Sequence, residues 1–292
     1  MSKLITTLLL ALMVVSSGAV FADDDARDYI AAPSGTKAFM VYARHISGNQ
    51  VYVDGDKVAD NTNLSMNLGI ARPIYYTEIG GVTAIFQALI PFADATLDGS
   101  DLGGASFLGS GLGDPIVSGG AWLVNNAEAR TWLAAAVYVT VPVGQYDNET
   151  VLNIGGNRWA FKPEIGLAKG LGTSKFHFDL IGNVEVYSNN TEYGAASVTL
   201  EQDPLITLES HLSYDLSKSV FASVDYWGHF GGETTVDEIA QDDAQSNHSI
   251  GAAVAFGFAP GYQLLAQYNG LVGVDNGSKT NTFGLRFAHF WN

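Results

Sequence analysis

The sequence predicts an all-β protein: a transmembrane antiparallel up-and-down β-barrel of about 12 strands. Apolar and polar residues alternate in segments of roughly nine to eleven residues, the length that a tilted membrane-spanning strand needs. Tight turns and long polar loops alternate between these segments, as in outer-membrane barrels. The last segment, Thr280–Trp291, carries aromatic residues on its apolar face, which lipid is expected to cover.

The amino terminus has the pattern of a secretory signal peptide. A short positive region, Met1–Lys3, precedes the uncharged apolar run Leu4–Val15, and small residues lead to a cleavage site after Ala22. We therefore expect a signal peptide at residues 1–22 and export to the outer membrane of a Gram-negative cell. Residues 23–35 are acidic and lack periodicity, so they are expected in the periplasm or the lumen. Residues 36–292 are the expected barrel.

Composition excludes several classes of function. The chain has no Cys, which removes disulfides, thiolate nucleophiles and Cys-ligated metals. Its formal net charge of -16 opposes binding to nucleic acid. Neither a cofactor nor a metal is expected. Low charge combined with many Gly and aromatic residues is typical of a β-protein with an apolar exterior.

Twelve segments have strand character. They are 36–45, 63–72, 82–92, 113–124, 130–142, 157–169, 175–187, 204–215, 219–230, 249–258, 262–269 and 280–291. Long connections are expected at 46–62, 93–112, 143–156, 188–203 and 231–248, with tight turns between them. In segment 204–215, Leu208 and Leu212 share one face, while Glu209 and His211 share the other. A period of two with charge on one face indicates a half-buried strand.

The middle of the chain resembles a known family. The runs Gly111–Pro115, Val141–Asp147 and Asn153–Pro163 read G-x-G-D-P, V-P-x-G-x-Y-D and N-x-G-x-N-x-W-x-F-x-P. This order resembles the outer-membrane barrels grouped as the transporter family of the phenol-degradation meta pathway. The resemblance implies an outer-membrane channel for hydrophobic or aromatic compounds. Physically, these Gly, Asp and Asn residues suit loop corners and strand ends, and Pro163 predicts a β-bulge because proline cannot donate to the ladder.

Projecting the alternating faces inward gives the candidate lumen-lining residues. They are Arg158, Lys162, Glu164, His177, Asp179, Glu185, Glu209, His211, Asp225, His229, Arg286, Trp132, Tyr138 and Trp227. The charged residues either pair with one another across strands or line a path for solutes. The aromatic residues either form an apolar path or fill a narrow lumen.

The predicted function is passage of small molecules across the outer membrane. One alternative is a barrel enzyme of the lipase or protease type, for which His229, His248 and Ser249 are available near the long loops. No nucleophile motif accompanies them, so an enzyme is not expected. Another alternative is a structural barrel that transports nothing. Expected partners are outer-membrane lipid, lipopolysaccharide, the solute and the barrel-assembly machinery, which recognises aromatic-rich terminal strands.

Overall fold

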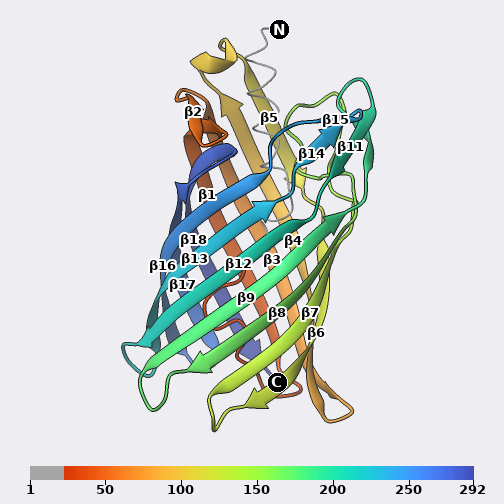
Figure 1. Cartoon of the computed structure of the whole chain (residues 1–292). Coiled ribbons are helices and arrows are strands. Elements are labelled where there is room, and N and C mark those ends of the chain that lie inside the picture. The colour runs from red at the N-terminus through yellow and green to blue at the C-terminus, as the bar shows by residue number, and fades with distance from the viewer. Residues whose placement is uncertain (1–22) are drawn as a thin grey trace.

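The computed structural model describes residues 23–292 and shows a single closed barrel (Figure 1). The predicted signal peptide lies outside the described residues. The barrel strands are β1 (Lys37–Val53), β3 (Asn63–Ile79), β4 (Val82–Asp98), β6 (Ile116–Asn126), β7 (Thr131–Thr140), β8 (Ala160–Gly170), β9 (Phe176–Tyr187), β12 (Leu205–Asp215), β13 (Val220–Gly231), β16 (Gln245–Ala259), β17 (Tyr262–Gly273) and β18 (Gly277–Trp291). Each pairs with the next barrel strand, and the antiparallel pairing of β18 with β1 closes the sheet. The predicted twelve-stranded barrel is confirmed.

The two ends of the barrel differ. At the short-turn end, five tight connections join neighbouring strands, and β1 begins beside the end of β18. The tightest is Gly80-Gly81, where both residues have positive φ (60° and 83°), as a type I′ hairpin turn requires.

The other end, the long-loop end, carries the remaining elements. They are β2 (Asp56–Ala59), the 3₁₀ helix η3 (Ser100–Leu102), β5 (Ser106–Leu112), and a four-stranded sheet of β10 (Asn190–Tyr193), β11 (Val198–Gln202), β14 (Thr234–Val236) and β15 (Ile239–Ala240). No helix among residues 23–292 has the length and apolar character of a membrane span.

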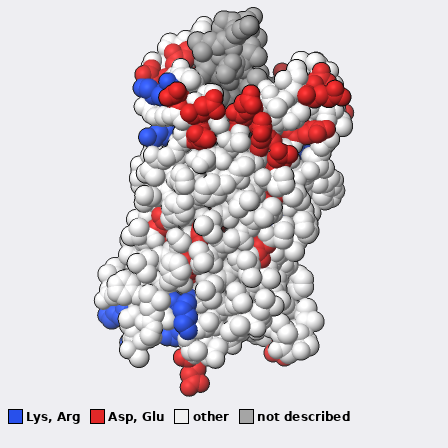
Figure 2. Space-filling model, in the orientation of Figure 1, with Lys and Arg blue, Asp and Glu red and all other residues white. Residues whose placement is uncertain are grey.

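The strand faces separate as the sequence predicts. In β12, Glu209 and His211 point inward and are fully buried, whereas Leu208 and Leu212 point outward and are each 43% exposed. The middle of the outer surface is largely uncharged, and Asp and Glu side chains gather at the long-loop end (Figure 2). Aromatic side chains meet at the short-turn end, where the rings of Phe176 and Tyr214 lie 4.7 Å apart. This is the outer surface of a membrane barrel, apolar in the middle and aromatic at an interface.

Two details of the strand prediction were wrong. Strands β1 and β4 extend well beyond the membrane-length segments predicted, to Val53 and Asp98, because their ladders continue into the long-loop end. Pro163 forms no bulge, since the β8–β9 register is the same on both sides of it. It points outward from β8, and the ladder omits its pair without slipping.

Candidate functional site

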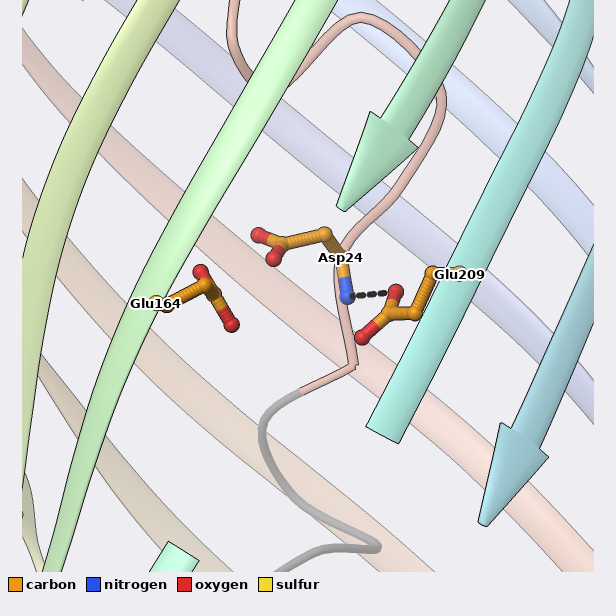
Figure 3. A group of neighbouring side chains, drawn as sticks. All are labelled: Asp24, Glu164 and Glu209. Carbon is orange, nitrogen blue, oxygen red and sulfur yellow. Dashed lines mark hydrogen bonds between the residues drawn. The ribbon is translucent and has the colours of Figure 1, made fainter. Parts of the chain in front are cut away.

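The lumen contains the chain's own amino-terminal segment, residues 23–36, which we call the plug. Its backbone and side chains bond to three wall strands. Asp24 N donates to Glu209 Oε2 (3.1 Å), and Arg27 N donates to Asp179 Oδ2 (3.1 Å). Tyr29 Oη donates to Glu164 Oε1 (2.6 Å). Figure 3 shows Asp24 between Glu164 and Glu209 inside the barrel.

Two arginines of the wall hold the middle of the plug. Arg72 Nη1 lies 3.0 Å from Asp28 Oδ2, and Arg286 Nη1 lies 3.1 Å from Asp28 Oδ1 and 2.7 Å from Asp25 Oδ2. All four side chains are at most 10% exposed. Removing one member of a buried ion pair costs about 3–5 kcal/mol, because its partner is left charged and unpaired. The plug is therefore firmly attached between β3 and β18.

The wall is shaped to accept Tyr29. Gly166 on β8 faces its ring, and a Cβ at this glycine would lie 2.3 Å from Tyr29 Cε1. Trp122 Nε1 donates to the Tyr29 carbonyl oxygen at 2.9 Å. A ring that fits against a glycine and bonds at both ends has one position in the lumen.

A second polar group joins β12 and β13. His211 Nδ1 lies 2.9 Å from Asp225 Oδ1, and Ser223 Oγ donates to Asp225 Oδ2 at 3.0 Å. The other imidazole nitrogen, Nε2, is 3.8 Å from Glu209 Oε2. The edge of the Trp227 indole packs against the imidazole, with ring centroids 5.5 Å apart.

Most of the predicted lumen residues are buried among these groups. The buried ones are Lys162, Glu164, His177, Asp179, Glu185, Glu209, His211, Asp225, Arg286, Trp132, Tyr138 and Trp227. His229 is half-buried and lies 3.8 Å from Asp23. Arg158 precedes β8 at the long-loop end, where its guanidinium stacks 4.4 Å from the centre of the Tyr187 ring. His248 is placed elsewhere, with Nδ1 2.8 Å from Tyr226 Oη.

Sequence reasoning missed the plug residues and one wall residue. Arg72 alternates with the inward-facing Ile70 and Ile74 on β3, so the period of two could have found it. Asp25, Asp28 and Tyr29 lie in a segment without periodicity, and no sequence signal indicates their partners.

Free space remains beside the plug. A cavity of ≈ 380 Å³ lies at the short-turn end of the lumen. Its apolar lining residues include Met40, Ile74, Tyr76, Phe221 and Phe290. A smaller space of ≈ 180 Å³ lies at the long-loop end beneath the loop at residues 146–158.

The sequence motifs meet around one carboxylate at the long-loop end. Asp114 Oδ1 accepts from Gly144 N (2.8 Å) and Oδ2 accepts from Gly156 N (2.7 Å). Burial raises the pKa of Asp114, although these amide donors favour its charged form. A Cβ on Gly144 or Gly155 would crowd Asp114, which explains both glycines. The three motifs thus fold one loop rather than surround a ligand.

Comparison with known proteins identifies the family. The family described as "Putative MetA-pathway of phenol degradation" matches residues 47–287. The chain belongs to this family. An outer membrane channel from Pseudomonas putida F1 is similar in structure, with 29% identity, a TM-score of 0.87, and coverage of 92% of this chain and 100% of that chain.

More distant structures share the fold. The transport unit of the autotransporter AIDA-I from Escherichia coli has 11% identity and a TM-score of 0.56, and covers 98% of this chain and 96% of its own. The beta domain of the Bordetella autotransporter BrkA has 13% identity and a TM-score of 0.52, and covers 89% and 100%. No match was found among curated protein sequences. The family and the Pseudomonas channel support an outer-membrane location and a channel role.

Proposed function

We propose that this chain is an outer-membrane channel for small, mainly apolar molecules, aromatic compounds among them, which pass through the lumen beside the plug. Outer-membrane barrels place their short turns in the periplasm. The short-turn end is then the exit, and the cavity there is the last part of the path.

The observation that carries this proposal is the lining of that cavity. The plug fills the lumen and its charges are paired with Arg72 and Arg286, so a hydrated ion or sugar meets a packed obstacle. The remaining ≈ 380 Å³ is bordered by aliphatic and aromatic side chains. An apolar solute loses no hydrogen bonds with water when it enters such a space, whereas a polar solute does.

Uptake by liposomes containing the purified barrel tests this proposal. Phe221→Ala changes the cavity, and Phe256→Ala makes the same change on the lipid-facing side, where Phe256 is 47% exposed. Loss of one aromatic contact alters binding by about 0.5–1.5 kcal/mol, which corresponds to roughly 2–10-fold. We expect a change of that size in phenol uptake for Phe221→Ala and none for Phe256→Ala. Faster entry of glucose than of phenol through the wild-type barrel would contradict the proposal.

A further inference from the structure

Three carboxylates converge where the plug meets the wall. Asp24 comes from the plug, Glu164 from β8 and Glu209 from β12 (Figure 3). One oxygen of each lies within 4.8 Å of the others. All three residues are buried, with exposures of 4%, 4% and 0%. Lys162 Nζ, 3.3 Å from Glu164 Oε2, is a cation beside them.

Several polar atoms at this place have no hydrogen-bond partner within residues 23–292. They are Asp24 Oδ2, Glu209 Oε1 and the Nε2 atom of His211, which is itself fully buried. Buried polar atoms are nearly always bonded, so a group of unbonded ones requires an explanation. All three can offer a lone pair, and a cation is the ligand that accepts lone pairs.

The imidazole is held in the manner of a metal ligand. Its Nδ1 is 2.9 Å from Asp225 Oδ1, and Asp225 is in turn oriented by Ser223. When Nδ1–H donates to Asp225, the lone pair is on Nε2, which lies on the side of Glu209. Metal-binding histidines typically donate their other ring N–H to a carboxylate in this way, because the bond fixes the tautomer and the ring orientation.

We propose that Asp24, Glu164, Glu209 and His211 form a binding site for a divalent transition-metal cation such as Zn²⁺ or Mn²⁺. The 3.8 Å between His211 Nε2 and Glu209 Oε2 is spanned by one ion with bonds of roughly 2.0–2.2 Å. Three carboxylates and the Lys162 ammonium sum to a charge of -2, which a divalent ion neutralises. An imidazole ligand favours these metals over Ca²⁺ and Mg²⁺, which prefer oxygen ligands only.

Metal binding here would fasten the plug. Only Asp24 belongs to the plug, whereas the other three ligands are fixed on β8 and β12. An ion shared between them cross-links the segment to the wall, next to the Tyr29–Glu164 hydrogen bond. Loading with metal then favours the closed lumen, and a chelator favours release of the plug.

The test measures metal binding directly on the purified, chelator-treated barrel. Titration with Zn²⁺ by calorimetry, and with Mn²⁺ by the loss of its free-ion EPR signal, should give one ion per chain. We expect Asp24→Asn and Glu209→Gln to weaken binding by at least about 100-fold, and Asp225→Asn by about 10–100-fold, since it acts through His211. Asp179→Asn is the matched control, because it also removes a buried lumenal carboxylate that accepts from the plug. It should bind as wild type.

Three results would overturn the proposal. They are no stoichiometric binding to the wild-type barrel, equal weakening by Asp179→Asn and Asp24→Asn, or Ca²⁺ binding as tight as Zn²⁺. A gel shift on boiling shows that each variant is folded. If Glu209→Gln fails to fold, Asp24→Asn decides the question, because Asp24 lies outside the barrel wall and its removal leaves every strand intact.

Discussion

Gly166→Ala should loosen the plug without altering any charge. A Cβ at this position would lie 2.3 Å from Cε1 and Cζ of Tyr29, whereas carbon atoms in contact need about 3.5–4.0 Å. The ring must therefore move by more than about 1 Å. Gly166 is paired with Ala134 and Ile181 on either side, so the wall itself can keep its register.

The size of the effect follows from the bond that the movement breaks. Tyr29 Oη donates to Glu164 Oε1 at 2.6 Å, and a hydrogen bond to a charged group contributes about 1.5–3 kcal/mol. At 1.4 kcal/mol for each factor of ten, the ratio of docked to undocked plug falls by roughly 10–150-fold. Larger or more frequent current steps should follow in planar bilayers.

Gly182→Ala is the matched control for this experiment. Gly182 lies on the neighbouring strand β9, and a Cβ there meets only Leu208 Cδ1 at 4.0 Å. It should conduct as wild type. If Gly166→Ala gave the same current record as Gly182→Ala, with both folded, the plug would not control passage through the lumen.

Three further predictions follow. Leu208→Arg should cost about 2–4 kcal/mol in urea unfolding because it places a charge in lipid, and Thr207→Arg should cost less because it faces the polar lumen; equal losses would refute this assignment of faces. Asp114→Ala leaves the amides of Gly144 and Gly156 without their acceptor, so faster proteolysis within residues 143–156 is expected while the barrel stays intact. Terminal sequencing of the protein from outer membranes should begin at Asp23, and a longer chain would contradict the predicted cleavage site.

The barrel was predictable because it depends on local patterns. The alternation of Leu208 and Leu212 with Glu209 and His211 fixes which face of β12 meets lipid, and the tight turns fix which strands are neighbours. The aromatic face of β18 indicated closure of the sheet onto β1. These signals lie within ten residues or between adjacent strands.

The attachment of the plug was not predictable for a physical reason. Asp28 is held by Arg72 and Arg286, which are distant in sequence, and no repeat or motif relates the three. Predicting the inward direction of Glu164 and Glu209 did not reveal that their neighbour would be Asp24. The family motifs were misleading in this respect, because they drew attention to the loop around Asp114, where the structure shows a loop-folding role.

The distant partners of the plug have a consequence for the order of folding. Tyr29 bonds to a residue 135 positions away, and Asp25 to one 261 positions away on the last strand. Contacts between such distant positions form only after most of the chain is in place. Docking of the plug is then a late step that follows formation of β18, and until that step the newly assembled barrel is an open pore. The last strand to form thus supplies the arginine that closes the lumen.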